Sequence, residues 1–291
     1  MSVLRVLVGL LWLYNVVWKK PDFGRSSGNG VYGFSRDAVE HPVFPPYSWL
    51  VENLVLPNFT AFGWTVLVVE TLLAVLLLTG TLVRLAALVG VGQSLAIGLS
   101  VAQTPGEWPW AYWMMIGIHV VLLFTASGQV AAVDRVRAEA ASGDGRAAAA
   151  RLLRGWGLVV GLTGLVALLL SVGEDPFAST GTRLGGPGLS VSLGSYNLVG
   201  ALVLLVVGAL MFAAASSGSR TMAWAAVALS GVAAALLYIS LSGAEVGLGG
   251  DNTSAAYFLC AATVSGVTGK LLGTAASRSE RTARHGSART S

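Results

Sequence analysis

The fold of this protein is decided by residues 62–78, which read FGWTVLVVETLLAVLLL. A transmembrane helix needs about 20 mostly apolar residues, and this run with its neighbours is long enough to cross a bilayer. Glu70 lies in the middle of the run. A carboxylate at that depth costs about 2.5–3.5 kcal/mol on insertion scales, so it is kept only where it faces a protein interior or a water-filled pocket. The stretch therefore predicts a multi-span membrane protein with a polar interior.

The composition excludes several classes of protein. Hydrophobic residues make up 54% of the chain and charged residues 11%, whereas soluble domains carry about a quarter charged residues. The net charge of +4 comes from residues at span ends and in one tail, so nucleic acid is not an expected partner. The single cysteine, Cys260, excludes an internal disulfide and a Cys-based iron–sulfur site. Only His119 among the three histidines lies in a span, which excludes a haem held by two histidines of this chain.

Eight apolar stretches have the length and composition of membrane spans. They are 2–18, 60–79, 82–101, 110–128, 155–172, 193–215, 222–242 and 254–274. The first is short, but Trp18, Lys19 and Lys20 follow it in place of a signal-peptide cleavage site, so we expect a retained helix. The expected fold class is all-α: a polytopic membrane protein with about eight transmembrane helices.

The basic residues predict how these spans are oriented in the cell (plasma) membrane. With the N-terminus in the cytoplasm, thirteen of the 18 lysines and arginines fall on the cytoplasmic side, as the positive-inside rule requires. Both termini are then cytoplasmic. Lys19 and Lys20 oppose this orientation, because they follow the first span on the side that should be poor in cations.

The chain divides into two membrane halves. Residues 1–134 are predicted to form a four-helix bundle with a long extracytoplasmic loop at 19–59. Residues 135–154 are expected to be a cytoplasmic linker and 155–275 a second four-helix region, while 276–291 form a basic tail with too little apolar sequence to fold.

The long loop contains the pattern of one short amphipathic helix. Its apolar residues fall at positions 47, 50, 51, 54 and 55, a helical spacing. Tyr47 and Trp49 would hold this helix flat on the membrane. Two interpretations stay open: a lid over an outward-opening pocket, or an interfacial anchor alone.

Polar residues in the first four spans predict one interior site. Glu70, Gln93 and His119 each lie near the middle of their span, and a rise of about 1.5 Å per residue places them at similar depth. Asn15 lies nearer the outer end of the first span, and Tyr112 shares the helix face of His119. We therefore take Glu70 and His119 as candidate catalytic residues that handle protons, and Asn15, Gln93 and Tyr112 as candidate ligand-binding residues.

Two interpretations of this cluster stay open. In the first, Glu70 and His119 exchange protons beside a quinone or another small ligand. In the second, they only hold the helices in register, at under about 1 kcal/mol for each interhelical hydrogen bond. One histidine and one glutamate are too few ligands for a closed metal site, so no metal is expected.

Aromatic residues crowd the outer end of the fourth span. Trp108 and Trp110 form either an interfacial belt or the mouth of the pocket, and we include both as candidate ligand-binding residues. The second half is almost without polar residues inside its spans. Its glycine pairs, Gly157 with Gly161 and Gly269 with Gly273, are typical of close helix packing. We interpret that half as packing or as an oligomerisation platform, so a homo-oligomer is among the expected partners.

Four stretches of the first half carry a resemblance to a known family. They are 4–12, 45–58, Glu70 with 77–88, and 105–112 followed by Gly128 and Asp134. In this order and spacing, residues 4 to about 135 resemble the DoxX superfamily and, within it, the DoxD-type small subunit of thiosulfate:quinone oxidoreductase. The resemblance covers less than half of the chain.

The resemblance implies a four-helix membrane bundle that interacts with quinone. It also implies electron transfer from thiosulfate, with a second, redox partner subunit. The lipid bilayer is the other expected partner, and quinone the one cofactor implied. The four further spans depart from the short family pattern. The alternative function is a non-enzymatic membrane scaffold or accessory protein of the DoxX type, so enzymatic activity is left open.

Overall fold

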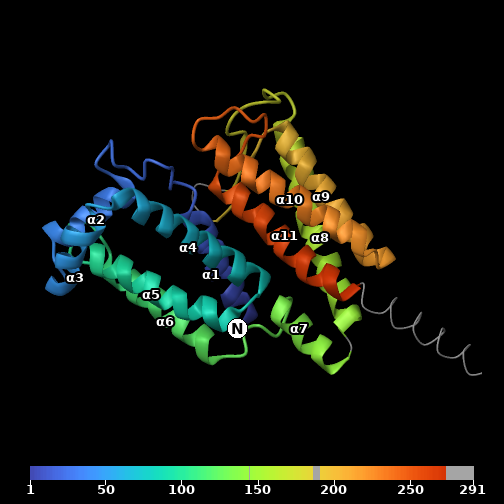
Figure 1. The fold of residues 1–291 in the computed structure, drawn as a ribbon, viewed down its shortest axis with the longest axis horizontal. Helices are drawn as coiled ribbons and strands as arrows, with labels where there is room; N and C mark the ends of the chain where they lie inside the picture. The colour runs from blue at the N-terminus through green and yellow to red at the C-terminus, as the bar shows by residue number, and fades with distance from the viewer. Residues whose placement is uncertain (144, 186–190, 273–291) are drawn as a thin grey trace, which may run out of the picture.

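The computed structural model describes residues 1–143, 145–185 and 191–272. Two groups of helices lie side by side in it (Figure 1). They meet where α11 (Asn252–Leu272) packs against α4 (Phe59–Thr79) and α1 (Ser2–Asn15). The predicted basic tail, 276–291, lies outside the described residues.

The helices are those of a multi-pass membrane protein. Within the described residues, six are long and apolar enough to cross a membrane. They are α4, α5 (Val83–Val101), α8 (Gly145–Ser171), α9 (Leu198–Ser217), α10 (Arg220–Ser240) and α11. The all-α membrane class is thus confirmed.

The predicted count of eight spans is not matched. The helices at the first and fourth predicted spans, α1 and α6 (Pro109–Phe124), have 14 and 16 residues and fall short of the needed length. The chain turns at residues 16–18, which ends α1, and α6 stops before the extended backbone of Thr125. Both predicted spans were too long, because they included residues 16–18 and 125–128, which are not helical.

The first half is built from α1, α4, α5 and α6. Gly80, with φ +66°, ends α4 in the left-handed conformation that glycine favours. The next helix, α5, is capped from a distant segment: both oxygens of Asp134 accept hydrogen bonds, from the backbone N–H groups of Leu82 and Val83, each at 2.9 Å. Pro109 stands in the first turn of α6, where a missing N–H costs nothing.

Three short helical segments cover one end of this bundle. They are α2 (Gly30–Glu40), α3 (Pro45–Leu50) and the π-helical turn η1 (Val51–Val55). The short helix predicted from the apolar spacing is found as α3 and η1. The sequence did not indicate α2, because it begins with Gly30 and follows a stretch rich in glycine and serine that is typical of turns.

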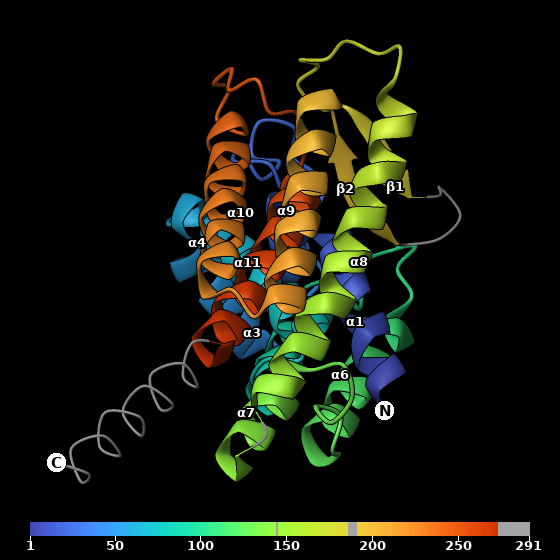
Figure 2. The same cartoon turned by 90° about the vertical axis from the view of Figure 1, so that its right-hand side faces the viewer.

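The segment between the halves is mostly helical. Residues of the predicted linker, 135–154, lie in α7 (Val133–Ser142) and in the first turns of α8, which begins at Gly145. Two short antiparallel strands, β1 (Thr182–Gly185) and β2 (Ser192–Tyr196), pair as a hairpin, and β2 occupies the start of the predicted span 193–215. Figure 2 shows this hairpin beside α8. The helix of that span begins only at Leu198, capped by the Asn197 side chain, which accepts the Gly200 N–H at 2.8 Å.

The helices of the second half pack closely through small residues. A Cβ atom added at Gly208 of α9 would lie 2.4 Å from the backbone nitrogen of Gly161 in α8. The predicted role of the Gly157 and Gly161 pair in close packing is therefore confirmed, whereas Gly273 of the other pair lies outside the described residues.

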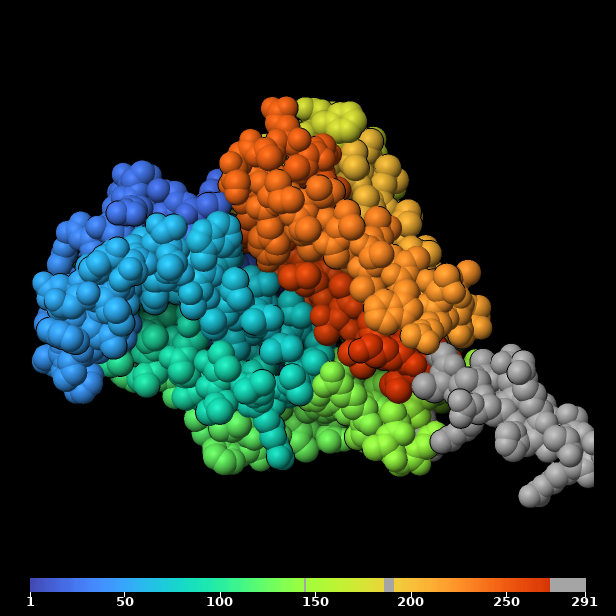
Figure 3. Space-filling model, viewed as in Figure 1, coloured from blue at the N-terminus to red at the C-terminus, as the bar shows by residue number. Residues whose placement is uncertain are grey.

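Seen as a surface, the first half and α11 form one continuous body (Figure 3).

Candidate functional site

A buried ion pair lies inside the first half. The Lys19 Nζ atom is 2.5 Å from Glu70 Oε2, and each side chain is 2% exposed. The ammonium group also donates to the backbone carbonyl of Asn15 at 2.9 Å and lies 3.9 Å from the centre of the Trp18 ring. Since a charge in a low-dielectric interior is costly unless it is paired and hydrogen-bonded, these contacts explain how the bundle tolerates Glu70.

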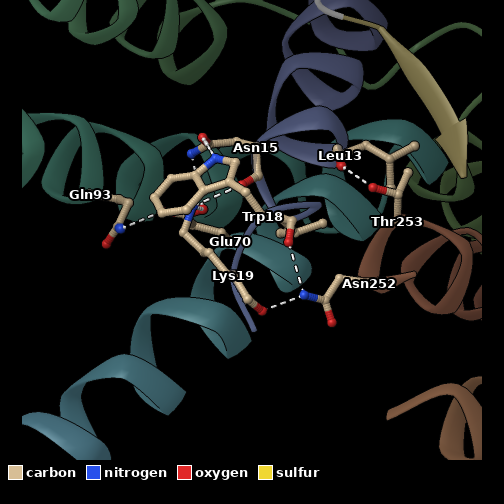
Figure 4. Close-up of polar contacts among 9 residues, drawn as sticks. Leu13, Asn15, Trp18, Lys19, Glu70, Gln93, Asn252 and Thr253 are labelled. Carbon is tan, nitrogen blue, oxygen red and sulfur yellow. Dashed lines mark hydrogen bonds and ion pairs between the residues drawn. The ribbon is translucent and has the colours of Figure 1, made fainter. Parts of the chain in front are cut away.

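Two amide side chains complete the coordination of the Glu70 carboxylate. Asn15 Nδ2 donates to Oε2 at 3.0 Å, and Gln93 Nε2 donates to Oε1 at 3.1 Å. Trp18 Nε1 in turn donates to Asn15 Oδ1 at 3.2 Å, which fixes the orientation of that amide. Figure 4 shows these groups converging from α1, α4 and α5 on one carboxylate.

The second half holds Lys19 in place. Asn252, the first residue of α11, donates from Nδ2 to the carbonyls of Val16 at 3.0 Å and Lys19 at 2.5 Å. Thr253 donates to the Leu13 carbonyl at 3.0 Å. These carbonyls belong to the end of α1 and its exit turn, which have no glycine cap of their own. The turn that carries Lys19 is therefore shaped by α11 (Figure 4).

His119 lies in a separate, neutral arrangement. Its Nε2 atom accepts a hydrogen bond from Trp12 Nε1 at 3.0 Å, because an indole nitrogen can only donate. Its Nδ1 atom therefore carries the proton and donates to the Met115 carbonyl at 2.7 Å. Glu70 is not a partner of either ring nitrogen. The structure thus brings together Glu70, Gln93 and Asn15 of the candidate residues, and joins His119 to Trp12 instead.

A cavity of about 660 Å³ lies beside the ion pair. Small-molecule sites have volumes of roughly 300–1,000 Å³ and mostly apolar walls with a few polar groups. Lys19, Glu70, Asn15 and Gln93 are among the polar residues that line this cavity. Its aromatic lining comprises Trp12, Tyr14, Trp18, Phe34, Tyr47, Phe62 and Tyr112.

The cavity contains one unpaired buried donor. The Ser94 hydroxyl in α5 is 2% exposed and has no hydrogen-bond partner among the described residues. Serine in a helix commonly donates back to a carbonyl of the preceding turn, and a buried hydroxyl left unpaired costs about 1–3 kcal/mol. Ser94 is therefore a donor available to a molecule in the cavity.

The long loop forms part of the cavity wall. Val31 and Phe34 of α2 and Tyr47 of α3 line it. The Tyr47 hydroxyl lies 3.1 Å from the Ala96 carbonyl, to which it donates, and 2.9 Å from the Ser100 hydroxyl, which fastens α3 to α5. Burial raises the pKa of Tyr47 above its ordinary value, so the phenol stays protonated and able to donate.

The aromatic residues at the start of α6 divide into two groups. Tyr112 lines the cavity, and its hydroxyl donates to Glu107. Trp108 and Trp110 stack edge-to-face with ring centres 4.9 Å apart and are not among the cavity-lining residues. Trp108 is 68% exposed, the position expected of an interfacial belt residue.

The sequence pointed to Lys19 without assigning it to the site. The signal was its departure from the charge asymmetry next to a membrane segment, because ionisable residues within such segments usually face the protein interior and pair with one another. Asn252 gave no such signal, since an asparagine at the start of a span reads as an ordinary helix cap.

Within the described residues, no three His, Cys, Asp or Glu side chains gather closely enough to hold a metal ion. No family model, curated protein or solved structure matches this chain.

Proposed function

We propose that this integral membrane protein is a redox-linked, quinone-interacting subunit whose ligand occupies the cavity beside Lys19 and Glu70. The unpaired Ser94 hydroxyl is the observation that carries the proposal. A quinone is a flat, mostly apolar ring with carbonyl oxygens that only accept hydrogen bonds. It matches an aromatic cavity that holds an unpaired donor and an ammonium group.

The ion pair suits the chemistry that a bound quinone undergoes. Reduction of a quinone takes up electrons and protons together, and the Lys19 ammonium and the Glu70 carboxyl group are the proton-exchanging groups at the cavity wall. His119 would act indirectly, because it accepts a hydrogen bond from Trp12, and the Trp12 side chain lines the cavity.

The resemblance of residues 4 to about 135 to the DoxD-type subunit supports a quinone as the ligand and thiosulfate as the electron source. Both remain part of the proposal. The electrons would come through a partner subunit, and the predicted location is the plasma membrane with both termini in the cytoplasm.

Ligand binding tests the proposal directly. The full-length protein is purified in mild detergent, extracted with organic solvent and analysed for quinone by mass spectrometry. It is then titrated with a short-chain quinone while tryptophan fluorescence is recorded, because Trp12 and Trp18 line the cavity. We expect co-purifying quinone and saturable quenching. If neither co-purifying quinone nor saturable quenching is observed, the proposal is refuted.

A matched pair of serine variants makes the test specific. Ser94→Ala should weaken quinone binding by roughly 2- to 10-fold, the worth of one hydrogen bond of about 0.5–1.5 kcal/mol. Ser230→Ala is the control, because Ser230 is also buried with an unpaired hydroxyl but lies in α10 of the second half. Equal affinity for both variants would contradict the assignment of the cavity.

A non-enzymatic scaffold is the second candidate. It is favoured by the Glu70 carboxylate, whose two oxygens are both hydrogen-bonded within the protein. In that case Glu70→Gln should lower thermal stability without changing quinone binding or thiosulfate-dependent quinone reduction, assayed with the partner subunit.

A further inference from the structure

A second hollow lies between the two halves, away from the ion pair. It is a groove of about 870 Å³ lined by α1, α7, α8 and the segment 129–132, with single contributions from α4, α11 and β2. In Figure 2, α7 and the adjoining end of α8 lie at the same end of the molecule as the N-terminus. The predicted orientation places this end at the cytoplasmic leaflet.

The charges of the groove are mostly positive. Its charged lining residues are Arg5, Arg135, Arg151 and Glu139. Glu139 accepts hydrogen bonds from Arg135 at 2.5 Å and from Arg151 at 3.1 Å, so one carboxylate is shared by two arginines. The side chains of Arg135 and Arg151 are 49% and 69% exposed, so both remain accessible to an anion.

Arg5 is the least compensated of these cations. It is fully buried, and only its Nη2 atom is bonded, donating to the carbonyls of Val130 at 3.3 Å and Ala131 at 3.1 Å. Its Nε and Nη1 atoms have no hydrogen-bond partner among the described residues. The nearby Asp134 attracts it electrostatically, but both Asp134 oxygens already cap α5. A buried guanidinium with two unpaired donors is costly unless an anion stands close to it.

The rest of the groove wall is apolar. It is formed chiefly by Val6, Leu10, Leu78, Leu152, Trp156 and Val159. From Arg151 to Val159 the groove follows α8 for roughly 12 Å at a rise of about 1.5 Å per residue. A cationic end joined to an apolar trough matches the two parts of a phospholipid: an anionic headgroup and an acyl chain.

We infer that this groove binds one molecule of an anionic phospholipid. Its phosphate lies against the exposed side chains of Arg135 and Arg151, the buried Arg5 adds positive charge from the groove wall, and one acyl chain lies along α1 and α8. The bound lipid bridges the two halves, since the residues that line the groove come from both.

The test uses the full-length protein in mild detergent and measures lipid retention by native mass spectrometry. The probes are phosphatidylglycerol and phosphatidylcholine with the same acyl chains. We expect one phosphatidylglycerol to be retained in preference to phosphatidylcholine. Equal retention of the two lipids would overturn the inference.

Charge variants locate the headgroup. Arg135→Gln and Arg151→Gln should each lower phosphatidylglycerol retention by roughly fivefold, since an arginine near an anionic membrane lipid contributes about 1 kcal/mol. Glu139→Gln should raise retention, because it releases both arginines. Arg220→Gln is the control, as Arg220 is a cation at the start of α10 that does not line the groove. An effect of Arg220→Gln as large as that of Arg135→Gln and Arg151→Gln would refute the site.

A glycine variant locates the acyl chain. Gly155 lines the groove, and a Cβ atom there would meet open space, so the side chain of Gly155→Leu should extend into the trough and lower retention. Gly231→Leu, at an equally open position in α10, is the control. Inorganic phosphate and glycerophosphoglycerol are the last arm. If either raises the melting temperature as much as phosphatidylglycerol does, the groove is a site for a soluble anion and the lipid assignment fails.

Discussion

Lys19 Nζ lies 2.5 Å from Glu70 Oε2. Lys19 follows α1, at the end of that helix where the positive-inside rule predicts few cations. The pair explains two anomalies of the sequence together. Glu70, a carboxylate in the middle of a membrane span, is paired with a cation. Lys19, a lysine on the side where few cations are expected, points into the protein interior. Each residue makes the other tolerable, so neither is expected to be replaceable alone.

Removing one member of this pair should destabilise the protein strongly. Lys19→Met leaves the Glu70 carboxylate buried without its cation, which typically costs about 3–5 kcal/mol. The double variant Lys19→Met with Glu70→Gln should lose less than the sum of the single changes. Thermal unfolding in detergent of the four proteins in this cycle measures the coupling. Strict additivity would show that the two groups do not interact.

The contact between α11 and the end of α1 should couple the two halves. Asn252→Ala removes both hydrogen bonds to the Val16 and Lys19 carbonyls and leaves those carbonyls buried, so we expect a loss of about 1–3 kcal/mol. If this contact positions Lys19, quinone affinity should fall as well. Thr253→Val is the control: it removes the single bond to Leu13 and should spare the cavity. Unchanged stability of the Asn252→Ala protein would contradict the coupling.

The packing of His119 against α5 should make Gly90 intolerant of a side chain. A Cβ atom at Gly90 would lie 2.1 Å from His119 Cδ2 and 2.3 Å from Nε2. Gly90→Ala must therefore displace the ring and break its bond with Trp12, at a cost of about 1–3 kcal/mol.

Gly92→Ala is the matched control for that change. Gly92 lies two residues further along α5 and has nothing within 4 Å of its added Cβ atom. There, replacing a helical glycine should stabilise the protein by about 0.5–1 kcal/mol. Melting temperatures that shift in the same direction for both variants would argue against the close contact.

Acid should loosen α7 from α8. The hydrogen bond from Arg135, followed by the charges of Arg135 and Arg151, lowers the pKa of Glu139 below its ordinary value of 4.5. Because its pKa is lower in the folded state, Glu139 stabilises the protein above the pKa of the unfolded chain, and this contribution is lost as the pH falls through the folded-state pKa. Hydrogen exchange of α7 should therefore accelerate in acid in the natural protein, whereas in Glu139→Gln it should already be fast at neutral pH. Identical pH profiles would exclude the contact.

Several features could be predicted from the sequence alone. Mean hydropathy and span length determine the all-α membrane class, since apolar runs of this length have few other stable environments. The depth of Glu70 and Gln93 within their spans was enough to place them in one cluster, because a helix rises by a constant amount per residue. The amphipathic spacing at 47–55 located α3 and η1, although it could not show that Tyr47 lines a cavity.

Other features were decided only by the tertiary structure. The turn after α1 sends Lys19 inward because Asn252, more than 200 residues away, bonds its carbonyl, and no local pattern encodes that contact. His119 bonds Trp12 and not Glu70 because helix rotation, which sequence depth does not specify, decides which side chains meet. Local periodicity determines which residues can enter the interior, whereas long-range packing determines which of them touch.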